Sequence, residues 1–298
     1  MTNTCIGLFL SSLVLALVLS PLFRRAALRL GVVDIPKGLK DHPSPTPYLG
    51  GLAIFLSFIL PISVLMALRA SLPIPLLGLL AGGTVVCGLG LLDDLKGLSP
   101  QVKAFGSSAA ALILMLCGIR LRIVFFPAWL NLALTYLWIV GITQAFNIID
   151  ILDGLSAGVA FIAASTFFLI AIPTQNLLVA IASASLAGAS LGFLRSNFHP
   201  ANIFMGDCGS LLLGFTLAGV SILESYTTAN DIALLSPLLI LAIPIYDTFY
   251  VSTLRMLRRR SPFRGSKDHF ALRLRAIGCL LYASPSQRDR TRSRMPSS

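Results

Sequence analysis

Charged residues are scarce in this 298-residue chain, and their scarcity excludes most soluble folds. Only 12% of the residues are Asp, Glu, Lys or Arg, and the mean hydropathy is +0.85. A soluble domain carries roughly twice that charged fraction. Apolar runs recur along the chain, and about 20 such residues are enough to cross a bilayer as a helix. We therefore predict an all-α, polytopic integral membrane protein.

The chain also lacks the short motifs of several common site classes. It contains neither G-x-x-x-x-G-K-[ST] nor G-x-G-x-x-G, so nucleotide binding by those loops is excluded. Its five cysteines are scattered and form no C-x-x-C pair, which argues against a disulfide framework or a zinc site. The net charge of +11 would suit a nucleic acid, but the basic residues lie beside apolar runs, where membrane topology explains them. We expect no nucleic-acid partner.

About nine membrane-spanning helices are predicted, with the N-terminus outside and the acid-rich loops in the cytoplasm. Most Lys and Arg residues fall in alternate loops, which the positive-inside rule places in the cytoplasm. The opposite loops hold only Arg69, Arg120 and Arg122. The first five residues lack a basic n-region, so we expect the first span to be retained. The predicted helices cover about residues 6–22, 50–68, 74–92, 102–119, 129–146, 155–172, 177–194, 210–223 and 232–254.

Adjacent carboxylates end the third predicted span. Asp93 and Asp94 would repel each other and the negative helix end unless a cation or a shared proton lies between them. Lys103 begins the next span, within reach of the same surface. Charge beside a bilayer is costly and is usually kept for binding, although a solvated helix end is the simpler alternative.

A second polar group links the fifth and sixth predicted spans. Asn147, Asp150 and Asp153 are spaced i, i+3, i+6, which would place them along one helical stripe. Such a stripe on a short apolar hairpin is expected to face a cavity or a partner. Ordinary loop polarity is the alternative.

Asp207 lies in a glycine-containing segment, Gly206-Asp207-Cys208-Gly209-Ser210, that we place just ahead of the eighth span. A helix N-terminus stabilises a carboxylate and offers free N–H groups to phosphate. Mg²⁺ typically binds one or two carboxylates together with substrate phosphates. The segment therefore predicts a Mg²⁺ site, with Mn²⁺ as the alternative ion; a cap and turn is the simpler interpretation.

Taken together, these segments resemble the polyprenyl-phosphate N-acetylhexosamine-1-phosphate transferases, glycosyltransferase family 4, which are related to phospho-N-acetylmuramoyl-pentapeptide transferase. The matching residues keep the family's order from about residue 30 to 275. They are His42-x-x-Pro45-Thr46-Pro47, Asp93-Asp94-x-x-Gly97-Leu98, Asn147-x-x-Asp150-x-x-Asp153-Gly154-Leu155, Asn197-x-x-Pro200-Ala201-x-x-Phe204-Met205-Gly206-Asp207-x-Gly209-Ser210, Pro244-x-x-Asp247-Thr248, and Ser261-Pro262-Phe263 with Asp268-His269.

The resemblance implies a multi-pass enzyme of the bacterial cytoplasmic membrane that begins cell-wall or surface-polysaccharide synthesis. Undecaprenyl phosphate would attack the β-phosphorus of a UDP-amino sugar, UMP would leave, and Mg²⁺ would be required. A homodimer is also expected. By the same resemblance Asp207 is the metal ligand, Asp93, Asp94 and His269 are the catalytic residues, and the substrate contacts are Lys103, Asn147, Asp150, Asp153, Asn197 and His42.

Several positions depart from the family pattern. Family members often have Asn where Gln144 stands, Gly where Ile151 stands and Arg where Tyr48 stands. Their last cytoplasmic loop usually carries several histidines, whereas only His269 is present here. This difference favours a UDP-GlcNAc donor over a sugar-pentapeptide donor.

We predict a single transferase domain over residues 1–276 and an atypical tail over 277–298. The tail is rich in Ser and Arg and cannot span a bilayer, so a truncated or frameshifted C-terminus is expected. Two other functions stay open: an ion-coupled transporter or lipid-binding scaffold, and an inactive truncated family member. Transporters place coupling sites near the midplane, whereas only Asp247 lies deep in a predicted span here, which favours the enzyme.

Overall fold

The structure is a computed structural model that describes residues 2–34, 46–70, 72–224, 235–258 and 269–276. His42 and the predicted tail therefore lie outside the described residues. The chain forms two compact units, Met1–Thr248 and Phe249–Ser298. The prediction of a single domain over residues 1–276 stays a prediction.

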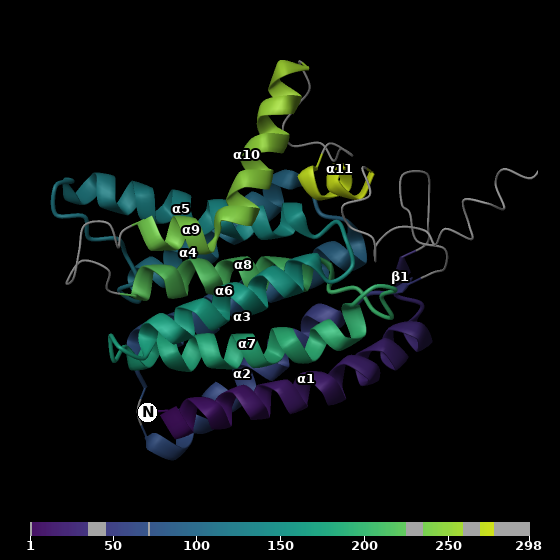
Figure 1. Cartoon of the computed structure of the whole chain (residues 1–298), viewed down its shortest axis with the longest axis horizontal. Coiled ribbons are helices and arrows are strands. Elements are labelled where there is room, and N and C mark those ends of the chain that lie inside the picture. The colour runs from purple at the N-terminus through teal and green to yellow at the C-terminus, as the bar shows by residue number, and fades with distance from the viewer. Residues whose placement is uncertain (1, 35–45, 71, 225–234, 259–268, 277–298) are drawn as a thin grey trace, which may run out of the picture. The chain divides into compact units, whose positions relative to one another are not determined.

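Eight helices of the first unit lie side by side in a bundle (Figure 1). Six of them are long and apolar enough to cross a membrane, and α4 and α6 are shorter apolar helices. This confirms the all-α, polytopic prediction, while the count of nine spans and their orientation stay predictions. The eight helices are α1 (Thr2–Leu30), α2 (Gly50–Arg69), α3 (Ile74–Lys96), α4 (Pro100–Leu116), α5 (Ala128–Ile149), α6 (Leu155–Ala171), α7 (Leu177–Asn197) and α8 (Gly206–Leu223).

A two-stranded antiparallel sheet joins the segments between α1 and α2. Strand β1 (Val33–Asp34) pairs with β2 (Thr46–Pro47) so that Val33 faces Pro47 and Asp34 faces Thr46. The carbonyl of Pro47 also accepts a hydrogen bond from the Phe204 N–H at 2.9 Å. The sheet therefore connects the start of α2 to the loop that precedes α8.

The predicted ninth span is interrupted in the structure. In place of one helix over 232–254 there are α9 (Ser236–Ile240) and α10 (Ala242–Leu257), separated at Leu241. Pro244 explains the break because it has no N–H to donate to the carbonyl of Ile240. Pro244 instead occupies the first turn of α10, where its missing N–H costs nothing.

Helix α8 occupies the centre of the bundle. Every residue from Cys208 to Ser221 is buried, and the helix packs against α3 and α5. A helix that is hydrophobic all round is typically buried in this way. The hydroxyl of Ser221, one of its few polar groups, accepts a hydrogen bond from Trp138 Nε1 at 2.9 Å and donates one to the carbonyl of Ala218.

Small residues on α7 allow α1 to pack very closely. A Cβ at Gly188 or at Gly192 would overlap the backbone of α1, so the two helices touch through a G-x-x-x-G face. Ser185 adds a polar link: its hydroxyl lies 2.8 Å from the Ser12 hydroxyl and donates to the carbonyl of Phe58 at 2.9 Å. One α7 side chain thus connects α1, α2 and α7.

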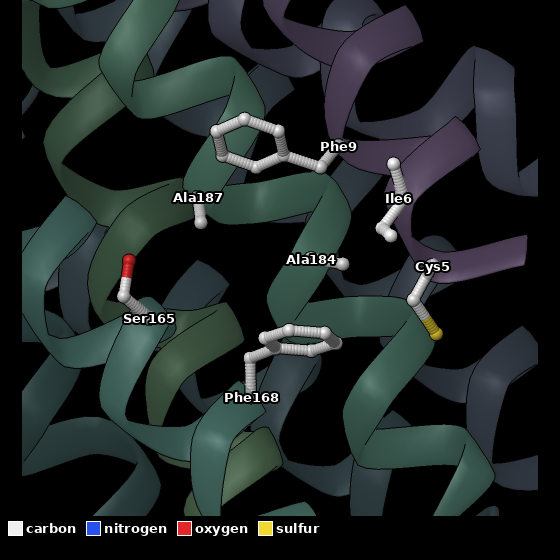
Figure 2. Close-up of a pocket in the computed structure, with 7 residues that line it drawn as sticks. All are labelled: Cys5, Ile6, Phe9, Ser165, Phe168, Ala184 and Ala187. Carbon is white, nitrogen blue, oxygen red and sulfur yellow. The ribbon is translucent and has the colours of Figure 1, made fainter. Parts of the chain in front are cut away.

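An apolar hollow of about 240 Å³ lies between α1, α6 and α7. Figure 2 shows the rings of Phe9 and Phe168 on either side of Ala184, with Ser165 also at its wall. The remaining wall is formed by Cys5, Ile6 and Ala187. No charged side chain lines it, so this hollow is unsuited to binding a phosphate or a metal.

The second unit contains the end of α10 and the short helix α11 (Phe270–Ala276). Tyr250 packs edge-to-face on Phe270, with ring centroids 6.3 Å apart. The Arg273 guanidinium lies 5.3 Å from the centre of the same Tyr250 ring, in a cation–π contact. These contacts fix α11 on α10, and His269 immediately precedes α11 in this unit.

Candidate active site

Three charged side chains from three helices meet at one end of the first unit. Lys103 of α4 forms an ion pair with Asp93 at the end of α3, and its Nζ lies 2.6 Å from Asp207 Oδ2 in the first turn of α8. Asp93 and Asp207 thus share one ammonium. When both carboxyl groups are ionised, that single positive charge leaves one of the two negative charges uncompensated. The arrangement is therefore suited to binding a further cation.

The turn between α3 and α4 brings Lys103 back over Asp93. Gly97 ends α3 with a φ of 67°, a conformation that favours glycine. The Leu98 N–H then donates to Asp93 Oδ1 at 2.6 Å, and the Ser99 hydroxyl caps the start of α4. Asp93 thus stabilises the turn with one carboxylate oxygen and contacts Lys103 with the other.

Asp94 caps the N-terminus of α8. Its Oδ1 accepts from the Asp207 N–H at 2.8 Å and its Oδ2 accepts from the Cys208 N–H at 3.1 Å. A carboxylate in this position satisfies two unpaired N–H groups and complements the positive end of the helix. Gly206 is required beside it, because its φ is 67° and a Cβ there would overlap the Asp94 carboxylate.

Glycines in α2 and α3 allow the start of α8 to pack closely against both helices. A Cβ at Gly51 would overlap the backbone N of Gly209, and one at Gly90 would overlap the backbone of Asp207 and Cys208. The Gly51 N–H donates to the Met205 carbonyl at 2.9 Å.

The prediction that Asp207 precedes the helix was wrong. Because α8 begins four residues earlier than expected, Asp207 lies inside its first turn.

Asn147, Asp150 and Asp153 do not share one helical stripe, which corrects the prediction from their spacing. Helix α5 ends at Ile149, Asp150 follows it, and Asp153 lies in the turn before α6. Asn147 alone joins the cluster: its side chain hydrogen-bonds to Asp207 and donates to the Ser210 hydroxyl at 3.0 Å. The spacing rule fails because the helix ends inside the motif.

Asp153 organises the loop that leads to α8. Its Oδ2 accepts from the Ala201 N–H at 3.0 Å and lies 2.9 Å from His199 Nδ1. Asn197 is buried and connects the same loop to the turn before α6. It accepts from the Gly154 N–H at 3.1 Å and donates to the Ile203 carbonyl at 3.0 Å. Both the oxygen and the nitrogen of the Asn197 side-chain amide are therefore hydrogen-bonded within the protein.

Asp150 faces the acidic cluster without entering it. Burial raises the pKa of Asp150 to about 8, and the carboxylates of Asp207, Asp94 and Asp153 add to the increase. An acid in this environment is poised to accept a positively charged or hydrogen-bond-donating group. When Asp150 is ionised without such a partner, its charge lowers the stability of the folded protein.

Asp34 and Tyr48 border the site but were missed in the sequence. The Tyr48 hydroxyl hydrogen-bonds to Asp34, and its pKa is raised by burial and then by the charges of Asp34, Asp94 and Asp207. The Tyr48 ring also packs on Phe204, with centroids 6.1 Å apart. The available signal was that Asp34 is an acid among basic loop residues and that Tyr48 directly precedes the Leu49-Gly50-Gly51 turn.

Two predicted site residues, His42 and His269, stay predictions. His42 lies outside the described residues, and His269 belongs to the second unit. Within the described ranges, no three His, Cys, Asp or Glu side chains gather as a preformed metal site. The Asp93–Asp207 pair offers two carboxylates, which matches the number that Mg²⁺ uses alongside substrate phosphates.

Comparison with known proteins identifies the family of the chain. The model of glycosyl transferase family 4 matches residues 76–225, the stretch that supplies Asp93, Lys103, Asn147 and Asp207. A probable undecaprenyl-phosphate N-acetylglucosaminyl 1-phosphate transferase of Bacillus subtilis is 35% identical over 91% of this chain and 77% of its own length. A decaprenyl-phosphate N-acetylglucosaminephosphotransferase of Mycobacterium tuberculosis is 35% identical, over 86% and 72%.

A relative with a different printed activity also matches. A phospho-N-acetylmuramoyl-pentapeptide-transferase of Halalkalibacterium halodurans is 37% identical over 71% of this chain and 72% of its own length. The transferases thus align with most of the described bundle as well as with the acidic cluster. The chain belongs to glycosyl transferase family 4.

Proposed function

We propose that this protein transfers N-acetylglucosamine 1-phosphate from UDP-GlcNAc to a polyprenyl phosphate and releases UMP. The observation that carries the proposal is the Lys103 ammonium held between the carboxyl groups of Asp93 and Asp207. The names of the Bacillus and Mycobacterium relatives support the lipid acceptor and the sugar. The bacterial cytoplasmic membrane is the matching location, and a homodimer stays a prediction.

Phosphoryl transfer needs positioning and neutralisation of negative charge more than covalent help. Asp207 and Asp93 would hold Mg²⁺, since two ionised carboxylates that share one ammonium carry one negative charge more than the ammonium compensates. The bound ion would neutralise the diphosphate of the donor. Lys103 supplies positive charge at the same place, and Asn147 keeps Asp207 oriented through its hydrogen bond.

The acceptor does not need a strong base. A lipid phosphate is largely ionised near pH 7, because its second pKa is about 6 by analogy with phosphoserine. Its oxygen forms the new bond to the β-phosphorus while the bond to UMP breaks. Asp93 is engaged with Lys103 and Asp94 with the N–H groups of α8, so both are better suited to positioning than to proton transfer.

Transport is the less favoured function. An ion-coupled transporter places its site near the midplane of broken helices. Here Asp93, Lys103 and Asp207 lie at the ends of α3, α4 and α8, where a soluble nucleotide sugar can reach the bilayer surface.

The decisive experiment follows UMP release by the purified full chain in detergent, with undecaprenyl phosphate, UDP-GlcNAc and Mg²⁺. We expect release that EDTA abolishes, and a loss of at least about 100-fold in Asp207→Asn. Glu224→Gln is the matched control, because Glu224 is a buried acid at the other end of α8. Full turnover by folded Asp207→Asn, or release that persists in EDTA, would contradict the metal site. Release from UDP-N-acetylmuramoyl-pentapeptide alone would overturn the choice of sugar.

A further inference from the structure

The loop between α4 and α5 forms a second, separate surface at the opposite end of the bundle. Lys103 lies in the first turn of α4, whereas Arg120 and Arg122 follow its last turn. A helix rises 1.5 Å per residue, so the length of α4 separates the two ends by about 25 Å. This surface is therefore independent of the acidic cluster.

Both arginines of this loop are exposed, and they line an open pocket of about 380 Å³. Within the described ranges, neither guanidinium forms a hydrogen bond or an ion pair. Arg122 is two residues after Arg120, and both side chains border the same hollow together with Asn131. Two unpaired guanidinium groups at one pocket give a site for an anion that accepts several hydrogen bonds, above all a phosphate.

The pocket is held in shape by side chains of α5. Asn131 accepts from the Ile123 N–H at 3.0 Å and donates to the carbonyls of Ile123 and Phe126. The Leu121 N–H donates to the Thr135 hydroxyl at 3.0 Å. These bonds fix the backbone on both sides of Arg122, so the point from which its side chain extends is defined before any ligand arrives.

Large apolar side chains follow the arginines in the same loop and at the start of α5, and they are largely exposed. The exposed fractions are 86% for Val124, 85% for Phe125 and 69% for Trp129. The loop joins two apolar helices, so it lies where a bilayer meets water, and aromatic residues are enriched at that depth. Exposed apolar groups beside exposed arginines match the two parts of a phospholipid, its acyl chains and its phosphate.

We propose that Arg120 and Arg122 bind the phosphate of an anionic phospholipid headgroup while Val124, Phe125 and Trp129 enter the adjoining acyl region. The loop anchors the end of the bundle that lies away from the carboxylates. Net negative lipid is favoured over zwitterionic lipid, because two guanidinium charges face the pocket and no described carboxylate pairs with them.

Trp129 provides a direct readout. The chain has two tryptophans, so Trp138→Phe leaves Trp129 as the sole fluorophore. The full chain with this change is reconstituted into vesicles that contain brominated phosphatidylglycerol or, at equal mole fraction, brominated phosphatidylcholine. We expect phosphatidylglycerol to quench Trp129 at least about twofold more strongly. Equal quenching by both lipids would overturn the headgroup site and leave apolar insertion only.

Variants assign the preference to the two arginines. The double change Arg120→Gln and Arg122→Gln should equalise the two lipids. Arg69→Gln should retain the difference, because Arg69 is on the same end of the bundle but donates to Thr4 and lies outside the pocket. Each single Gln variant should lose part of the preference, which keeps the test decisive if the double variant does not fold. A folded double variant that still prefers phosphatidylglycerol would overturn the proposal.

Discussion

At the scale of single residues, the two adjacent aspartates have different partners. Asp93 faces Lys103 and Asp207, whereas Asp94 is bound by the N–H groups of Asp207 and Cys208. Asp94→Asn exchanges one accepting oxygen for a donor and should lose one capping bond, a cost of about 1–2 kcal/mol. The thermal midpoint in detergent should fall by a few degrees.

Asp93→Asn should behave differently, because its amide oxygen can still accept from the Leu98 N–H. We expect a midpoint close to that of the parent and a turnover reduced by about 100-fold. The pair of variants is measured by thermal unfolding and UMP release on the same preparations. A parent-like midpoint with no turnover in Asp94→Asn would mean that Asp94 acts on substrate instead of on α8.

Asp150 gives a prediction about pH. Its pKa of about 8 lies above the ordinary value of about 3.9, so the folded protein holds this proton more tightly than the unfolded chain. Stability from this group therefore falls as pH rises from about 4 to about 8 and then levels off. In EDTA, the midpoint of Asp150→Asn should exceed the parent's by a margin that widens between pH 5.5 and pH 8. A constant or shrinking margin would show that Asp150 is not buried beside like charges.

The acidic residues could be predicted as site candidates, because charged residues are rare in an apolar chain and are usually kept where they bind something. Their individual roles were not. Asp94 became a cap only because α8 begins at Gly206, and Asn147 separated from Asp153 only because α5 ends at Ile149. Asp34 and Tyr48 come together through the pairing of β1 and β2, which involves two residues in each strand. Contacts of that kind leave no periodic signal in a sequence.

At the scale of helices, hydrophobic runs located the spans well but misplaced their ends. The prediction stopped the first helix at Leu22, yet α1 continues to Leu30 through Arg24 and Arg25. Arginines can continue a membrane helix at its end, because their apolar stems pack along the helix while their charged groups stay in water. The break before α10 was signalled by Pro244, but a proline inside an apolar run can equally well sit within an intact membrane helix.

The contact between α1 and α7 offers a test at this scale. Gly188→Leu should separate the two helices, because even a Cβ at Gly188 would overlap the Phe9 carbonyl. We expect little monodisperse protein after detergent extraction and a lower thermal midpoint. Gly141→Leu is the matched control, since Gly141 also lies in a membrane-length helix but a Cβ there would have nothing within 4 Å. Equal loss in both variants would mean that the G-x-x-x-G face is not what holds α1.

At the scale of the whole molecule, charge predicts orientation. Among the described residues of the first unit, Arg24, Arg25, Arg29, Lys96, Lys103 and Arg195 lie toward the end that holds the carboxylates, whereas Arg69, Arg120 and Arg122 lie toward the other end. The positive-inside rule therefore places Lys96 in the cytoplasm and Val124 outside. Both side chains are exposed, so a cysteine at either position should be reactive wherever a reagent can reach it.

The orientation can be read in intact cells with a membrane-impermeant maleimide. Cys117 and Cys279 are first replaced by serine; Cys5, Cys87 and Cys208 are buried and should stay unreactive. Val124→Cys should then be labelled in intact cells, and Lys96→Cys only after the membrane is permeabilised. The reverse pattern would put the acidic cluster outside, where a cytoplasmic UDP-sugar could not reach it, so the proposed transfer requires this one orientation.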